Sequence, residues 1–196
     1  MPTAPPSAPN ALASLGAIWM VAGISHRFHA CDQGIQPALL ALQDLLPLRA
    51  EDLRVIEVVV HPRRVRGCAD AAPMTGSSAR YSIATVLAMA ILGYDTTQPA
   101  RFSDATCADP AVQALRAKVR VRVDPTTSET AARLRVQSRK GLFEASHDMI
   151  APLDLAQRKA QVLRKAGALV GDERAAALWL AVDGLQSPDN FAALLT

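Results

Sequence analysis

The residues most able to do chemistry gather in one short stretch, residues 25–36, which reads SHRFHACDQGIQ. His26, His29 and Cys31 offer the nitrogen and sulfur atoms that zinc prefers, but a structural zinc site needs about four ligands, normally from two separated pairs. The other two histidines of the chain lie far away in the sequence. We therefore predict no metal, and interpret the stretch as a polar loop between a strand and a helix.

A second interpretation of the stretch is a cysteine nucleophile. His29 is close enough to Cys31 in sequence to act as its base, but no third group that would orient the histidine is evident. Cys68 and Cys107 have no neighbouring base and are expected to fill space in the core. The odd number of cysteines and the lack of a CxxC pair predict reduced thiols and a cytoplasmic protein.

Arginines form three groups, and two of the groups have the spacing of a strand. Arg120 and Arg122 alternate with valine, and Arg133 and Arg135 alternate with leucine and valine, so they should line the outward face of a sheet. A solvated face is the simplest explanation, and capture of polycarboxylates by guanidinium groups is the functional alternative. Aromatic residues make up only 4% of the chain, so we predict no nucleic-acid partner.

Several common catalytic motifs are missing from the sequence. It contains no GxGxxG, GxxxxGKS/T, GxSxG or HExxH, which removes the usual signatures of dinucleotide binding, phosphate binding, serine hydrolases and zinc proteases. We predict that no cofactor is bound. The apolar run near the N-terminus is too short to cross a bilayer, so we also predict no membrane association.

Apolar periodicity predicts the elements that must position these residues. Aliphatic residues recur at helical spacing over about 36–46 and 80–94, and the second helix is expected to be capped by Ser77 or Ser78. Residues 61–78 suggest a loop or a broken helix. The other expected elements are strands over 53–60 and 119–123, a helix over 109–119, a hairpin over 131–148 with Gly141 at its turn, helices over 153–170 and 172–185 divided at Gly171, and a short helix over 188–195.

Composition divides the chain into three parts. Residues 1–14, rich in proline, are expected to form a disordered arm. A strand over 17–24 should open an α+β domain that spans residues 15–150, and residues 151–196 should form C-terminal helices. Because strands and helices do not alternate strictly, we predict a mostly antiparallel sheet backed by helices, with a helical extension, instead of a doubly wound sheet.

Five segments occur in the order typical of one known family: SHRFHACDQGIQPALLAL, RVIEVVVHP, ARYSIATVLAMAILG, FSDATCADPAVQALRAKVRVRVD and, after the hairpin, APLDLAQRKAQVL. The chain resembles MmgE/PrpD proteins, which include 2-methylcitrate dehydratase, cis-aconitate decarboxylase and iminodisuccinate epimerase. The resemblance spans about residues 16–194. It concerns the C-terminal part of these proteins, a small α+β lid domain with terminal helices, and finds no counterpart of their large N-terminal helical domain.

The resemblance implies a carboxylate-binding site at the opening stretch. The family's lid begins with a motif of the KPYPCC or KFHAAC kind, whose lysine faces the substrate in a cofactor-free lyase site between the domains. Arg27 stands at the lysine position, His29 at the aromatic or histidine position, and Arg80 where the family usually has lysine. Asp32 stands where decarboxylase-like members have histidine. We therefore expect these four side chains to contact the substrate.

Departures from the family pattern bear on the chemistry. Arg27 keeps the positive charge but cannot donate a proton at neutral pH. Asp32 places a negative charge where an anionic substrate should bind, and the two would repel each other. Ile35 and Gln36 replace a Thr-His pair of the family. The family's other acid and base residues lie in the helical domain, so we expect this sequence alone to be catalytically incomplete.

Two functions remain open at this point. The chain could be one half of a split, cofactor-independent dehydratase that acts on tricarboxylates of the 2-methylcitrate or aconitate type, with the helical domain on a separate chain. Alternatively, it could be a non-enzymatic binding module that keeps the fold and self-associates. In that case an apolar stripe around Leu178, Val182 and Leu185 would form the contact between copies.

Overall fold

The computed structural model describes residues 17, 26–68, 70–150 and 154–184. The predicted arm over 1–14, all but one residue of the predicted strand over 17–24 and the predicted final helix over 188–195 lie outside these residues. From residue 26 onward the order of elements agrees with the apolar pattern, and residues 61–78 form a broken helical stretch.

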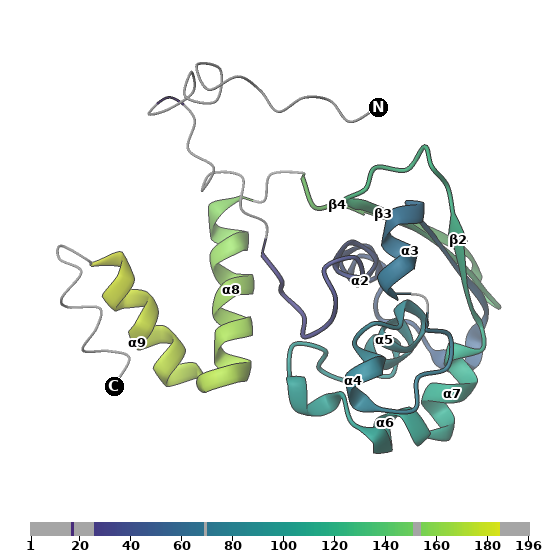
Figure 1. Cartoon of the computed structure of the whole chain (residues 1–196), viewed down its shortest axis with the longest axis horizontal. Coiled ribbons are helices and arrows are strands. Elements are labelled where there is room, and N and C mark those ends of the chain that lie inside the picture. The colour runs from purple at the N-terminus through teal and green to yellow at the C-terminus, as the bar shows by residue number, and fades with distance from the viewer. Residues whose placement is uncertain (1–16, 18–25, 69, 151–153, 185–196) are drawn as a thin grey trace, which may run out of the picture.

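The sheet is organised around β1 (Leu53–Val60), a run of β-branched residues that suits a strand with one buried face. Ile56, Val58 and Val60 are fully buried on its inner side. Within the described residues, β1 is an inner strand of a four-stranded sheet with the order β2-β1-β3-β4 (Figure 1). The other strands are β2 (Val119–Val123), β3 (Ala131–Ser138) and β4 (Gly141–Asp148).

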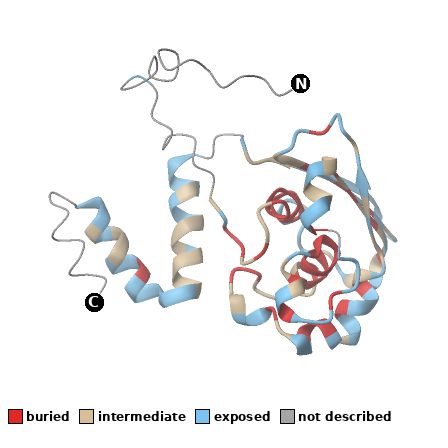
Figure 2. Ribbon diagram, viewed as in Figure 1, coloured by how far each residue is buried: buried red, intermediate tan, exposed pale blue. Residues whose placement is uncertain are grey.

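Two apolar helices cover the inner face of this sheet (Figure 1). α2 (Gln36–Gln43) packs against β3 and β4, and α5 (Ile83–Ile91) packs against α2 and β2. Nearly all residues of both helices are buried, so the core lies between them and the sheet (Figure 2). The shorter helices are α3 (Pro62–Cys68), α4 (Gly76–Ala79), α6 (Asp104–Ala108) and α7 (Pro110–Arg116), and 3-10 turns span Ala50–Asp52 and Pro99–Arg101.

The strand pairing makes the sheet mixed. β1 pairs with β3 and β3 with β4 in antiparallel fashion, as expected for the hairpin closed at Gly141, whose φ is +137°. β1 pairs with β2 in parallel, because the chain passes through α3 to α7 before it returns to the same sheet. Two of the three pairings are antiparallel, which confirms the predicted α+β fold with a mostly antiparallel sheet.

The start of α5 differs from the expectation. Ser82 caps this helix, since its hydroxyl accepts a hydrogen bond of 3.2 Å from the amide of Thr85. The predicted caps, Ser77 and Ser78, lie within α4, where Ser78 forms a capping box with Thr75. The prediction was wrong because an extra short helix separates residues 75–79 from α5.

The C-terminal helices form a pair beside the α+β unit (Figure 1). α8 (Leu155–Val170) and α9 (Asp172–Asp183) are divided at Gly171, whose φ of +88° suits glycine, as the sequence predicts. No residue of α8 is buried, and in the described part of α9 Ala175 is the one buried residue (Figure 2). These helices therefore add little to the core.

Candidate functional site

The side chain of Gln36 holds the backbone of residues 28–31 in place. Its side chain is fully buried at the start of α2. Its Oε1 accepts hydrogen bonds from the amides of Phe28 (3.1 Å) and His29 (3.0 Å), and its Nε2 donates to the carbonyls of His29 (3.2 Å) and Cys31 (3.3 Å). One side-chain amide thus satisfies four backbone groups of an irregular segment. The sequence alone presented Gln36 as a departure from a family motif, and gave no sign of this structural role.

His29 is buried and held at both ring nitrogens. Its Nδ1 lies 2.7 Å from Oγ1 of Thr96, and its Nε2 lies 3.4 Å from Nε2 of Gln43. Burial, and then the positive charges of Arg164 and Lys165, lower the pKa of His29 to about 4. The ring is therefore neutral at neutral pH and works as a hydrogen-bonding group, not as a cation.

Asp32 carries a negative charge in this region. Burial raises the pKa of its carboxyl, but the hydrogen bonds from the Cys68 thiol and the Gly34 amide outweigh that effect, so the pKa of Asp32 lies below its ordinary value. The nearby charge of Arg27 acts in the same direction. Asp32 is thus a carboxylate at neutral pH.

Cys31 lacks the environment of a nucleophile. Burial, and then the charge of Asp32, raise the pKa of its thiol to about 12, so almost no thiolate is present at neutral pH. Its sulfur lies 3.4 Å from Nε2 of Gln36, whereas the ring of His29 contacts Thr96 and Gln43. The geometry favours a small structural thiol over a Cys-His pair.

Arg80 is fixed by contacts on several sides. Its carbonyl accepts a hydrogen bond of 2.9 Å from the amide of Asp32, and its Nη2 donates to the carbonyl of Pro99 at 3.2 Å. Its guanidinium lies 5.7 Å from the ring centroid of Phe102, which is a cation–π contact. Its Nε is buried and has no hydrogen-bond partner within the described residues. A guanidinium held by these contacts presents a fixed positive charge to an anion.

Lys165 approaches the same region from α8. Its Nζ donates a hydrogen bond of 2.8 Å to the carbonyl of Thr97, and burial lowers the pKa of its amine. One residue earlier, Arg164 forms an ion pair with Asp95 at 3.6 Å. These two polar contacts join α8 to the loop that precedes Pro99. The C-terminal helix therefore contributes a cation to a site formed mainly by the α+β unit.

A pocket of about 270 Å³ brings these side chains together. All four residues predicted from the sequence line it, and three of them are charged. Sequence reasoning missed Lys165, because nothing in its local pattern indicates that α8 turns this face toward the pocket. Among the described residues, the lining consists of Arg27, His29, Ala30, Cys31, Asp32, Arg80, Tyr81, Pro99 and Lys165, and the site is called the polar pocket below.

The charge of the polar pocket is positive. Arg27, Arg80 and Lys165 contribute three cations and Asp32 one carboxylate, while His29 is neutral, so the described part of the lining carries a net charge of +2. The guanidinium groups cannot act as proton donors at neutral pH. Of the lining groups, Lys165 combines a mobile proton with a lowered pKa. The pocket is thus equipped to hold an anion, and poorly equipped to move protons.

The family model for the MmgE/PrpD C-terminal domain matches residues 29–149, which is more than half of the chain. The chain belongs to the MmgE/PrpD family. The match begins at His29 and contains Asp32 and Arg80, while Arg27 and Lys165 lie outside it. A search of curated proteins finds no match to the chain. For this MmgE/PrpD chain, the family assignment therefore stands on the C-terminal domain alone.

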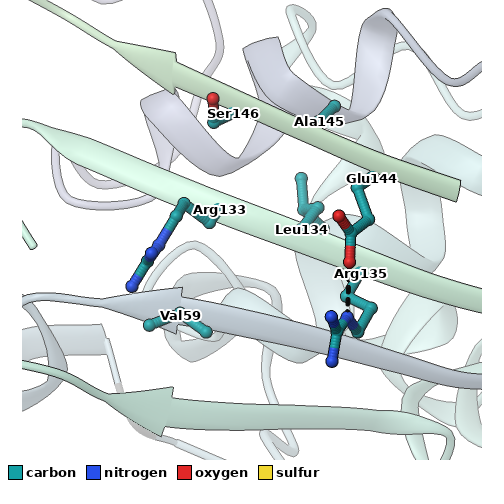
Figure 3. Close-up of a pocket in the computed structure, with 7 residues that line it drawn as sticks. All are labelled: Val59, Arg133, Leu134, Arg135, Glu144, Ala145 and Ser146. Atoms are coloured by element: carbon teal, nitrogen blue, oxygen red, sulfur yellow. Dashed lines mark hydrogen bonds and ion pairs between the residues drawn. The ribbon is translucent and has the colours of Figure 1, made fainter.

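The predicted arginine row is present on the outer face of the sheet. Arg122, Arg133 and Arg135 are exposed there and form ion pairs with Glu57 (2.8 Å), Asp124 (2.7 Å) and Glu144 (2.5 Å) respectively. Figure 3 shows part of this face, a pocket of about 450 Å³. The ion pair between Arg135 on β3 and Glu144 on the neighbouring strand β4 is visible there. Because carboxylates of the same face already satisfy these arginines, the polar pocket is the better candidate for anion binding.

The described residues contain neither a helix suited to a membrane nor a side-chain cluster suited to a metal. None of their helices has the length and apolar character needed to cross a membrane. No group of three or more histidine, cysteine, aspartate or glutamate side chains among them is arranged to hold a metal ion.

Proposed function

We propose that this chain provides the carboxylate-binding lid of a cofactor-independent MmgE/PrpD lyase site, and that a helical domain of the family must supply the remaining acid and base. The observation that supports it is the gathering of Arg27, Arg80 and Lys165 around one pocket. Three cations against a single carboxylate suit a ligand with two or three carboxylate groups. The substrate class is therefore a tricarboxylate of the 2-methylcitrate or aconitate type.

The protonation states in the pocket support an incomplete site. General acid–base catalysis needs a donor and an acceptor within hydrogen-bond reach of one substrate, with pKa values near the working pH. His29 has its pKa shifted to about 4 and both ring nitrogens engaged, and the thiol of Cys31 has a pKa of about 12. Elimination of water from a tricarboxylate therefore requires groups that a second domain brings to the pocket.

Binding can be tested by isothermal titration with citrate, succinate and acetate. We expect affinity to rise with the number of carboxylates, and Arg80→Gln and Lys165→Met each to weaken citrate binding by about tenfold, roughly one lost charged contact. Arg133→Gln, on the outer face of the sheet, is the matched control and should bind citrate like the wild type. Equal losses in all three variants, or no citrate binding by the wild type, would refute the proposal.

Catalysis is tested separately, by following unsaturated product in the ultraviolet after addition of 2-methylcitrate. The chain alone should give no turnover, and mixing it with a separately expressed helical domain of an MmgE/PrpD protein should produce turnover and co-elution. Rapid turnover by the chain alone would overturn the incomplete-site proposal and leave the binding result intact.

A second candidate function is a non-enzymatic, self-associating module, which the exposed aliphatic residues of the C-terminal helices favour. Leu180 and Val182 on α9 are 69% and 52% exposed, and Leu169 on α8 is 56% exposed. Of the stripe expected from the sequence, Leu178 is half-buried and Leu185 lies outside the described residues. Light scattering after size exclusion separates the candidates: a monomer that binds citrate supports the lid, whereas a dimer disrupted by Leu180→Glu supports the module.

A further inference from the structure

A second pocket lies at the edge of the sheet formed by β2. It has a volume of about 520 Å³, and its walls come from α3, α5, α7 and β2. Val65, Ala84, Val119 and Val121 provide its apolar surface. We call it the apolar pocket, and it differs from the polar pocket in having mostly aliphatic walls. Volumes of about 300–1,000 Å³ with apolar walls and few polar groups are typical of sites for small organic molecules.

Arg116 is the one cation among the described residues that line this pocket. Arg116, in the last turn of α7, lines the pocket, and its Nη1 is buried without a hydrogen-bond partner among the described residues. Arg116 also forms no ion pair with a described residue. Buried donors in proteins are nearly always satisfied, so this nitrogen of a pocket-lining arginine lacks an acceptor that a bound anion could supply.

The other polar groups of the apolar pocket, among the described residues, are Gln113, Cys68 and Asp70. The side-chain amide of Gln113 donates a hydrogen bond of 3.1 Å to the carbonyl of Cys107. Burial raises the pKa of Cys68, whose thiol donates to Asp32 at 3.0 Å, so it adds no negative charge. Asp70 adds one carboxylate to the lining; its Oδ1 accepts a hydrogen bond of 3.1 Å from the amide of Ala72, and it forms no ion pair with Arg116.

We propose that the apolar pocket binds a small aliphatic monocarboxylate, whose carboxylate pairs with Arg116 and whose hydrocarbon chain contacts Val119 and Val121. A single guanidinium matches a single carboxylate, in contrast to the three cations of the polar pocket. The aliphatic walls disfavour phosphate or a tricarboxylate, because these ligands would lose hydration without replacing it. This site is separate from the proposed function and does not depend on it.

The test is an NMR titration of the isotopically labelled chain with sodium hexanoate and with 1-hexanol. The amides of Val119 and Val121 should shift saturably with hexanoate, and hexanol, which has the same chain without the charge, should bind about tenfold more weakly. Because this comparison uses the wild-type protein, it stays decisive if a variant fails to fold. Equal binding of the two compounds, or no saturable shift with hexanoate, would overturn the proposal.

Variants then locate the site. Arg116→Gln should weaken hexanoate binding by about tenfold and abolish the preference over hexanol. Val121→Phe should block both compounds by filling the pocket. Arg120→Gln is the matched control, since Arg120 lies on β2 but on the face opposite to Val119 and Val121. This variant should leave both affinities unchanged. Unaltered hexanoate binding by Arg116→Gln would contradict the assignment. A change of oligomeric state in that variant, together with loss of hexanoate binding, would point to a different occupant and would also contradict it.

Discussion

The thiol of Cys68 donates a hydrogen bond of 3.0 Å to Oδ1 of Asp32. This bond links α3, which follows β1, to the segment that lines the polar pocket. Burial and then the bond to Asp32 raise the pKa of Cys68, while the same bond helps to hold the pKa of Asp32 below its ordinary value. The pair therefore fixes a neutral thiol and a negative carboxylate at the boundary between the polar and apolar pockets.

Replacing Cys68 by alanine should raise the pKa of Asp32, because the carboxylate loses the donor that most favours its charged form. The change can be followed by NMR titration of the side-chain carboxyl carbon. Cys107→Ala removes another buried thiol, one that makes no contact with Asp32, and serves as the control. An Asp32 titration that stays at the wild-type pH in Cys68→Ala would contradict this assignment of cause.

Asp32→Asn should strengthen citrate binding by about threefold to tenfold at low salt, because it removes the negative charge that Asp32 places in the lining of the polar pocket. Asparagine keeps an oxygen that can accept the hydrogen bond of 2.7 Å from the Gly34 amide, so the local turn should persist. Asp124→Asn, beside the outer face of the sheet, should leave citrate affinity unchanged. If Asp32→Asn binds citrate more weakly than the wild type, this carboxylate assists the ligand and does not repel it.

His29 should make the protein less stable between about pH 6.5 and 4. Its pKa is lowered from 6.5 to about 4, so over this window the unfolded chain takes up a proton that the folded chain does not, and the free energy of unfolding falls as the pH falls. The full effect is on the order of 3 kcal/mol and is complete below pH 4, where both states are protonated.

The contribution of His29 can be isolated with His29→Phe, which keeps an aromatic ring but does not titrate. Urea unfolding at several pH values should show a difference in stability between wild type and variant that changes across this window. Carboxylates with lowered pKa values, such as Asp95 and Asp148, also destabilise the fold in acid, but they are common to both proteins and cancel. A difference that is independent of pH would mean that His29 is not buried as a neutral ring.

Gln36→Leu should destabilise the protein by about 2–4 kcal/mol, because the amides of Phe28 and His29 would be left buried without acceptors. Gln137→Leu, at an exposed position on β3, is the matched control and should change stability by less than about 0.5 kcal/mol. The measurement is urea unfolding, together with amide hydrogen exchange over residues 28–31. Equal stability of the two variants would show that Gln36 does not hold this segment.

The sequence predicts most elements correctly where the apolar residues of a segment follow one period, either helical or alternating. β1 and the hairpin at Gly141 follow from period-two alternation and glycine at the turn, and α5 follows from its apolar residues. The start of α5 was placed too early, because several serines and a threonine offer competing caps and only the packing of α4 selects Ser82.

The site was predicted in part, for a related reason. The family pattern identifies side chains within one stretch and at Arg80, and the fold brings them to one pocket. It cannot identify Lys165, whose position depends on how α8 lies against the loop that precedes Pro99. It also cannot identify the unpaired nitrogen of Arg116, which depends on the packing of α7. Both are tertiary features with no local signal in the sequence.

Gly76 is the position where the fold should tolerate substitution least. It begins α4, and its amide donates a hydrogen bond of 2.8 Å to Oδ1 of Asp104. A Cβ at this position would overlap the carbonyl carbon and oxygen of Phe102, which are backbone atoms and cannot move without displacing the chain. Phe102 is buried beneath the guanidinium of Arg80, so any displacement also reaches the polar pocket.

Gly76→Ala should therefore lower the free energy of unfolding by about 3 kcal/mol or more, and should weaken citrate binding through Arg80. Gly67→Ala is the control: it lies in α3, where an added Cβ would meet no atom within 4 Å. Because alanine favours helices over glycine by about 1 kcal/mol, this variant should be as stable as the wild type or slightly more stable. Urea unfolding of both variants decides the point, since a Gly76→Ala protein of wild-type stability would mean that α4 and the Phe102 backbone do not approach so closely.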